Sequence, residues 1–209
     1  MRYTGPKVKL CRREWYNLFG TEKYNLNDNH RKPLGGGRGS KLSEFGVQLR
    51  KKQAAKRMFG LSEKQFARYY KEAFRRQGVT GDNMLQMLER RLDTVILRAN
   101  FARTIMQARQ FVGHAHFTVN GRKNNISSFQ VSIGDVITIK ERMKESPIYK
   151  TLLEEFQEFA SKNKSATVST SKWLEIDAKN LTIKVVALPE KGDFDQMIDI
   201  QRIIEFYSK

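Results

Sequence analysis

Apolar residues recur with helical spacing in four stretches of the first half of the chain. The first covers residues 43–59, and the second begins at Ser62, which forms a capping box with Gln65 three residues later. The third covers residues 82–99 and the fourth covers residues 103–112. The pattern therefore predicts four amphipathic helices in succession.

The spacing changes to that of strands after residue 113. Phe117–Val119 runs into Asn120-Gly121, the dipeptide most typical of a tight hairpin turn. Val136–Ile139 follows, and two alternating segments at 173–176 and 181–186 complete the predicted strands. Helices followed by short strands favour an α+β fold.

Two further helices are predicted late in the chain. Residues 148–159 form an acidic amphipathic pattern after Pro147. The apolar positions within residues 200–206 indicate a short helix, which needs another part of the fold to cover it.

The first 41 residues carry many cations and the glycine-rich run Gly35–Gly39. Such a composition is flexible and poor in core-forming side chains. It predicts a flexible basic N-terminal arm that orders against RNA. The apolar residues between positions 15 and 19 are the exception, and we expect them to seat one short helix on the body of the protein.

Charge points to the class of partner. The formal net charge is +17, and residues 1–60 hold 15 Lys and Arg against 4 Asp and Glu. The net charge is +7 over residues 61–140 and −1 over residues 141–209. This excess implies a polyanionic partner at the first two thirds of the chain, and leaves the last third for protein packing.

Cysteine use and hydropathy indicate the compartment. Cys11 is the single cysteine, so we expect neither a disulfide framework nor a cysteine cluster for zinc, as in a reducing compartment. No apolar run reaches the ~20 residues that cross a bilayer, and Met1–Leu10 lead into no apolar segment. A cytoplasmic protein without a membrane partner is expected.

No arrangement of residues indicates catalysis. The glycine-rich run ends in Gly39-Ser40-Lys41 and lacks the order of a Walker loop. His114 and His116 have no third metal ligand nearby, and Glu154 and Glu155 lie on a solvated helix. We therefore predict no enzyme, no cofactor and no metal site.

The stretch from Glu89 to Ile139 holds the most informative polar pattern. Arg103, Gln107 and Gln110 recur at helical spacing opposite the apolar face, with Arg109 beside them. Arginine pairs bidentately with phosphate oxygens, glutamine can reach sugar hydroxyls, and backbone donors at a helix start favour phosphate. We expect Asn120 to Arg122 to add a basic tip beside this surface.

Several segments resemble a known RNA-binding module, the one named after ribosomal protein S-four of the small subunit. The module also occurs in pseudouridine synthases, a class of tyrosyl-tRNA synthetase and heat-shock RNA-binding proteins. The segments that carry the resemblance are Arg91–Asp93, Arg103–Gln110, Val119–Arg122 and Gly134–Ile137.

Flanking segments resemble the ribosomal protein family itself, in its bacterial and zinc-free form, over nearly the whole chain. These segments are Tyr3–Lys7, Arg12–Glu14, Leu42–Gln53, Gln65–Ala73, Trp173–Asp177 and Glu205–Lys209.

The resemblance implies a primary binder of small-subunit ribosomal RNA. Such a protein contacts a helix junction in the 5′ domain, nucleates assembly of the subunit body, and influences translational accuracy through ribosomal protein S-five. It lies near the path by which messenger RNA enters the subunit, and DNA is not a partner. The implied parts are an arm over residues 1–41, a helical lobe over 42–89 and 188–209, and an inserted RNA-binding module over 90–187 in which two helices pack on a small β-sheet.

Two alternatives remain open: an RNA-modifying enzyme that uses the module as a tether, and a free translational repressor. In all three interpretations we expect polar side chains in the basic first two thirds of the chain to contact the RNA. The predicted RNA-binding residues are Arg12, Arg13, Lys41, Arg50, Lys51, Arg91, Arg103, Gln107, Arg109, Gln110, Asn120 and Arg122.

Overall fold

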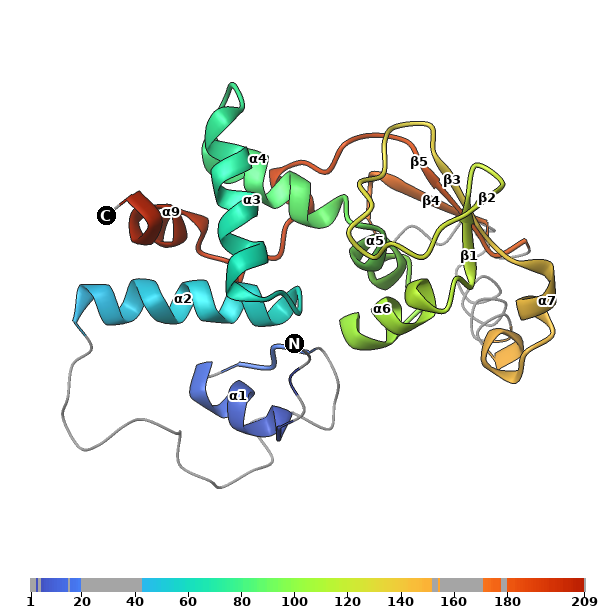
Figure 1. Ribbon diagram of the computed structural model, residues 1–209, viewed down its shortest axis with the longest axis horizontal. Coiled ribbons are helices and arrows are strands. Elements are labelled where there is room, and N and C mark those ends of the chain that lie inside the picture. The colour runs from blue at the N-terminus through green and yellow to red at the C-terminus, as the bar shows by residue number, and fades with distance from the viewer. Residues whose placement is uncertain are drawn as a thin grey trace. The chain divides into compact units, whose positions relative to one another are not determined.

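A computed structural model describes residues 3, 5–14, 16–19, 43–151, 154, 171–177 and 180–208 of the 209-residue chain. The chain forms two compact units, Met1–Leu85 with Asp195–Lys209, and Gln86–Phe194 (Figure 1). Among the described residues, no helix is long and apolar enough to cross a membrane.

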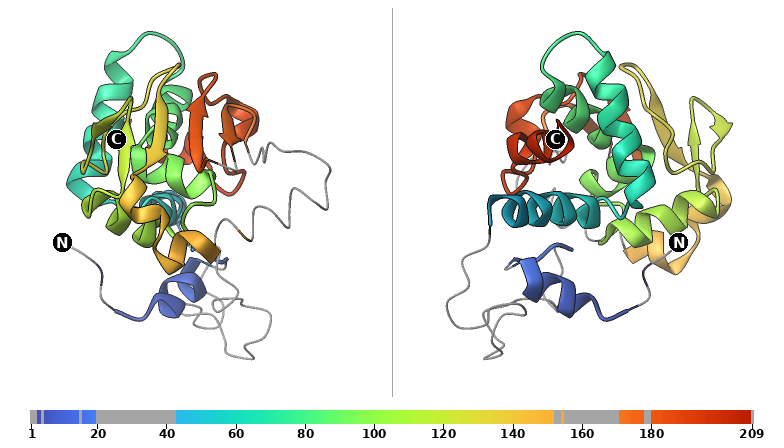
Figure 2. Two further views of the ribbon diagram at one scale, coloured as in Figure 1. Left: turned by 90° about the vertical axis from the view of Figure 1, so that its right-hand side faces the viewer. Right: turned by 60° about the vertical axis from the view of Figure 1, so that its left-hand side comes forward.

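The first unit is helical, and its C-terminal helix returns to its beginning. Helix α9 packs against α2, and Figure 2 shows the two helices side by side. The predicted C-terminal helix and its need for a partner are thus confirmed. The helices of this unit are α1 (Lys7–Glu14), α2 (Glu44–Met58), α3 (Glu63–Arg75), α4 (Thr80–Glu89), which runs on into the second unit, and α9 (Ile200–Ser208).

Side-chain caps fix where α2 and α3 begin. The Ser43 hydroxyl accepts a hydrogen bond from the Gly46 N–H at 3.2 Å. Ser62 and Gln65 satisfy each other's backbone N–H groups in the capping box that the sequence predicts. Each cap supplies an acceptor for helix donors that would otherwise lack one.

Helix α9 is held by a buried lysine. Lys52 of α2 places its ammonium 2.6 Å from a Glu63 carboxylate oxygen and 4.3 Å from the centroid of the Phe206 ring. The same Glu63 oxygen accepts a 2.8 Å hydrogen bond from the Tyr207 hydroxyl. Gly81 lies against this helix, since a Cβ there would sit only 3.0 Å from the Ile200 side chain.

Of the predicted basic arm, the structure describes residues 3, 5–14 and 16–19. Helix α1 comes earlier than the expected helix near residue 15, and Cys11, Leu18 and Phe19 form a small core with Ala54 of α2. The apolar period of α1 is hard to recognise because cations occupy half of its positions. The glycine-rich run lies outside the described residues.

The second unit packs two helices and a sheet around one core. The antiparallel sheet has the order β2-β1-β3-β5-β4. The predicted α+β class is confirmed. Its elements are α5 (Leu92–Arg98), α6 (Ile105–Gly113), β1 (Phe117–Val119), β2 (Arg122–Lys123), β3 (Val136–Ile139), α7 (Glu141–Lys144), β4 (Leu174–Asp177), β5 (Thr182–Val185) and a 3-10 turn, η2 (Lys191–Asp193).

The helix predicted over residues 82–99 is wrong, because the chain forms α4 and α5 with a break between them. Arg91 is extended there and pairs in an isolated bridge with Gln130. The Leu92 N–H donates to the Phe129 carbonyl, and the Arg90 carbonyl accepts from Val131. A distant loop thus satisfies the backbone at the break, which the local apolar period could not indicate.

The predicted acidic helix over residues 148–159 lies largely outside the described residues. The described residues of this range, 148–151 and 154, are helical. Tyr149 from this segment is buried in the core of the second unit.

Candidate nucleic-acid interface

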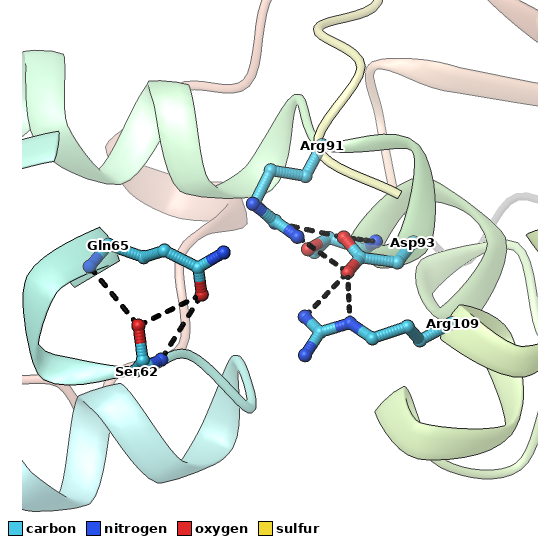
Figure 3. Close-up of polar contacts among 6 residues, drawn as sticks. Ser62, Gln65, Arg91, Asp93 and Arg109 are labelled. Atoms are coloured by element: carbon cyan, nitrogen blue, oxygen red, sulfur yellow. Dashed lines mark hydrogen bonds and ion pairs between the residues drawn. The ribbon is translucent and has the colours of Figure 1, made fainter. Parts of the chain in front are cut away.

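The break before α5 creates a buried cluster of charges. The guanidinium groups of Arg91 and Arg109 both converge on the Asp93 carboxylate, as Figure 3 shows. Arg91 donates at 2.9 and 2.7 Å, and Arg109 donates at 3.0 and 2.7 Å. The Asp93 side chain is 0% exposed and that of Arg91 is 3% exposed. Arg91 is therefore an interior residue, and the pair between Asp93 and Arg109 is the one that ties α5 to α6.

Arg109 differs from Arg91 in its exposure. Its side chain remains 30% accessible while it pairs with Asp93. A guanidinium paired with a carboxylate is fixed in orientation, and its accessible side can be approached by a phosphate. A similar pair joins Arg98 to Glu89 at 2.9 and 2.7 Å.

The start of α6 is capped by side chains. The Thr104 hydroxyl accepts from the Gln107 N–H at 3.2 Å, and the Gln107 side chain accepts from the Arg103 N–H at 2.8 Å. Two of the backbone donors expected to be free for a phosphate are thus occupied. The Arg103 and Gln110 side chains are exposed, whereas Gln107 is half-buried and serves as a cap.

The β1–β2 hairpin has the turn that the sequence predicts. Asn120 and Gly121 both have positive φ, at 51° and 75°. The Asn120 side chain donates to Asp135 at 2.8 Å and accepts from the Val136 N–H at 2.9 Å, so it braces the turn against β3. Arg122 is exposed in β2, as is its neighbour Lys123.

The other predicted residues belong to the first unit. Arg13 is exposed, while Arg12 and Lys51 are half-buried. Arg50 is also half-buried and pairs with the nearly buried Glu14 at 3.5 Å. Lys41 lies outside the described residues.

Sequence reasoning missed a row of cations on α3. Lys64, Arg68, Lys71 and Arg75 are all exposed, and within the described residues none of them forms an ion pair. Their spacing of four, three and four residues places them on one face of the helix. The helical spacing of these cations is the signal in the sequence that could have identified them. We call these four residues the α3 stripe.

The histidines show an ordinary structural environment. His116 stacks on Phe111 and shares a 2.9 Å hydrogen bond with the Tyr149 hydroxyl. Burial, with the nearby His114 and Lys140, lowers the pKa of His116 below its usual value. Within the described ranges, no group of three or more His, Cys, Asp or Glu could hold a metal ion.

Comparisons with known proteins cover the chain from end to end. A family model described as the ribosomal protein S4/S9 N-terminal domain matches residues 2–89, and a model of the S4 domain matches residues 90–137. The small ribosomal subunit protein uS4 of Heliobacterium modesticaldum is 44% identical over 100% of this chain and 99% of its own length. Proteins of the same name from Caldicellulosiruptor saccharolyticus and Acetivibrio thermocellus are 44% and 43% identical, over 100% of this chain and 99% of theirs.

Proposed function

The chain belongs to the family of the small ribosomal subunit protein uS4, and from this premise we propose that it is a structural, RNA-binding component of the small ribosomal subunit. The observation that carries the proposal is the full-length match, which includes the N-terminal domain as well as the S4 domain. The net charge of +17 supports a polyanionic partner.

The proposed mechanism is recognition of folded RNA by shape, through phosphate and 2′-hydroxyl contacts. In the second unit, Arg103, Gln110 and Arg122 are exposed and Arg109 is held in orientation by Asp93. Arg91, Gln107 and Asn120 would act indirectly, by fixing the backbone that presents those side chains. In the first unit, Arg13 is the most accessible of the predicted contacts.

The finer features of the family are proposed for this chain as well. It would bind the 5′ domain of small-subunit ribosomal RNA first and nucleate assembly of the subunit body. It would contact ribosomal protein S-five and other small-subunit proteins, and lie near the path by which messenger RNA enters. Its location would be the cytoplasm, within the ribosome.

The alternatives are less well supported. An RNA-modifying enzyme requires a catalytic lobe beside the module, but the chain outside the S4 domain matches a ribosomal N-terminal domain at residues 2–89. A free translational repressor would lie mostly outside ribosomes, which an immunoblot of a sucrose gradient would reveal.

Binding of the full chain to the 5′ domain RNA, with an unrelated RNA duplex as competitor, tests the proposal across a salt titration. We expect selective binding that survives the competitor, with a logarithmic salt slope of roughly −0.7 to −0.9 per phosphate contact. Equal binding to both RNAs, abolished together as salt rises, would mean that charge alone drives association and would contradict the proposal.

A further inference from the structure

Helix α3 combines two features that neither the predicted RNA surface nor the α5–α6 charge cluster includes. The first is the α3 stripe of four exposed cations. The second is Phe74, whose side chain is 68% exposed and borders the stripe one residue before Arg75. From this combination we infer that α3 carries a second RNA site, in which an unpaired base stacks on Phe74 while neighbouring phosphates pair with the stripe.

The cations of the stripe differ from the other cations near α2 and α3. Lys52 and Lys56 share Glu63, and Arg57 shares Glu14 with Arg50, so each of these cations is held by a carboxylate within the fold, although two cations share one anion in both cases. The stripe has no such partner among the described residues, and its neighbour Glu72 is engaged by Arg76 at 3.5 Å. Four like charges at this spacing repel one another, which a bound polyanion would relieve.

The spacing suits a nucleic-acid backbone. Neighbouring members of the stripe are separated by three or four residues, so their Cβ atoms lie roughly 5–6 Å apart. From Lys64 to Arg75 the stripe extends about 16 Å along the helix axis. A continuous row of this kind can follow several successive phosphates of one strand, as in sites that bind single-stranded nucleic acid.

The exposed ring of Phe74 is supported by neighbouring aromatic rings. Its ring lies 6.2 Å from that of Tyr70, which in turn stacks on Tyr207 at 4.8 Å. Tyr70 is half-buried, so the series fixes the Phe74 ring from within and leaves most of it open. A single exposed phenylalanine needs no explanation. Phe74, however, contacts Tyr70 in a tilted pair and is bordered by cations that form no ion pair among the described residues, which matches the aromatic-and-basic composition of base-stacking surfaces.

The inference rests on the proposed RNA-binding function, and the test separates the two. The probes are the 5′ domain RNA, a single-stranded RNA carrying the fluorescent base 2-aminopurine, and a fully paired RNA duplex. The variants are Phe74→Ala, Phe74→Tyr and a fourfold change of the stripe, Lys64→Gln, Arg68→Gln, Lys71→Gln and Arg75→Gln. The matched control removes the same number of charges elsewhere, through Arg142→Gln, Lys150→Gln, Lys172→Gln and Lys184→Gln.

For the stripe variant we expect affinity for the single-stranded probe and the 5′ domain RNA to fall at least roughly 10-fold, with a salt slope shallower by about 0.7 for each phosphate that is no longer neutralised. The affinity of the control variant for both RNAs should stay close to that of the parent protein. Phe74→Ala should weaken binding of the single-stranded probe by roughly 5- to 100-fold and abolish quenching of 2-aminopurine, while Phe74→Tyr should retain both. The duplex should not distinguish Phe74→Ala from the parent.

Three outcomes would overturn the inference. One is an equal fall in affinity for the stripe and control variants, which would mean that total charge alone matters. Another is unchanged single-strand binding in Phe74→Ala. The third is a stripe variant that keeps its RNA affinity yet no longer joins small subunits in a gradient, since the surface would then dock a protein. If the parent protein fails to select 5′ domain RNA, the proposed function fails, and the single-strand comparison still decides the inference.

Discussion

The charge cluster between α5 and α6 and the stripe on α3 use the same residue types in opposite ways. In the cluster, Arg91 and Arg109 surround the fully buried Asp93, and the charges hold the fold together. In the stripe, four cations face solvent without partners among the described residues. Burial and pairing thus make Arg91 a structural cation, whereas the exposed stripe is available to RNA, and Arg109, which is paired but 30% accessible, can serve both roles.

The largest expected effect falls on the cluster. Replacing Asp93 with alanine leaves two guanidinium groups without their carboxylate, one of them in the interior. We expect the free energy of unfolding to fall by about 3–5 kcal/mol. Urea denaturation measures this, with Arg75→Ala as a control that should change stability by no more than about 0.5 kcal/mol. Similar stabilities for the two variants would contradict the claim that the cluster, unlike the stripe, stabilises the fold.

Removing the charges of the stripe should raise the free energy of unfolding, whereas a substitution in the cluster lowers it. Its members form three like-charge neighbour pairs, each costing roughly 0.2–0.5 kcal/mol. The fourfold glutamine variant should therefore gain roughly 0.6–1.5 kcal/mol in its free energy of unfolding while its RNA affinity falls. Thermal and urea unfolding at low salt would detect the gain, which added salt should diminish. A decrease in stability would show that these cations are part of the fold.

Lys52, Lys56 and Tyr207 all bind the Glu63 carboxylate, and we call this group of contacts the Glu63 clasp. Its contribution to stability can be tested by changing the pH. Burial alone would raise the pKa of Glu63, but hydrogen bonds from Lys52, Lys56 and Tyr207 outweigh it and lower the pKa from 4.5 to about 2. A lowered folded-state pKa stabilises the protein above the unfolded value, and this contribution disappears as pH falls from 4.5 through about 2.

The Glu63 side chain is 46% exposed, so solvent screens its interactions. We therefore expect the clasp to contribute only about 1 kcal/mol to the free energy of unfolding. Unfolding measured across this acid range should show the decline in the parent protein and a flatter profile in Glu63→Gln. Identical profiles would mean that the clasp adds nothing to the docking of α9.

The smallest expected effect concerns a single exposed side chain in the second unit. Arg103→Glu reverses one charge at the start of α6 while keeping the backbone hydrogen bond to Gln107. Stability should hold, and RNA affinity should fall several-fold while the salt slope becomes shallower by about 0.7 to 0.9, the value for one phosphate. Fluorescence anisotropy with 5′ domain RNA at moderate salt measures this. An unchanged affinity would remove Arg103 from the proposed interface.

Local patterns were sufficient for much of the fold. The α2 and α3 helices, the capping box at Ser62 and the Asn120-Gly121 turn each depend on residues within a few positions of one another. The break at Arg91 could not be predicted in this way, because the loop near Phe129 supplies its hydrogen bonds. The same break explains why Arg91, predicted to bind RNA at the surface, is buried, with its backbone bridged to Gln130 and its side chain paired with Asp93.

The candidate site was less predictable than the fold for the same reason. Sequence spacing identified Arg103 and Gln110 as exposed side chains, but it could not tell that Arg91 and Arg109 share one carboxylate. Helical spacing could have revealed the α3 stripe. Whether its members lack partners, however, depends on where every acidic side chain lies in the folded chain.

The most direct test of this account is a lysine-modification footprint. The full chain would be acetylated at limiting reagent, free and bound to 5′ domain RNA, and each lysine quantified by mass spectrometry. We expect RNA to protect Lys64 and Lys71 of the stripe and Lys123 of β2, while Lys52 and Lys56, already paired with Glu63, keep the same reactivity in both states. Protection of Lys52 and Lys56, or a lack of protection at the stripe, would contradict the claim that the exposed cations of the stripe bind RNA.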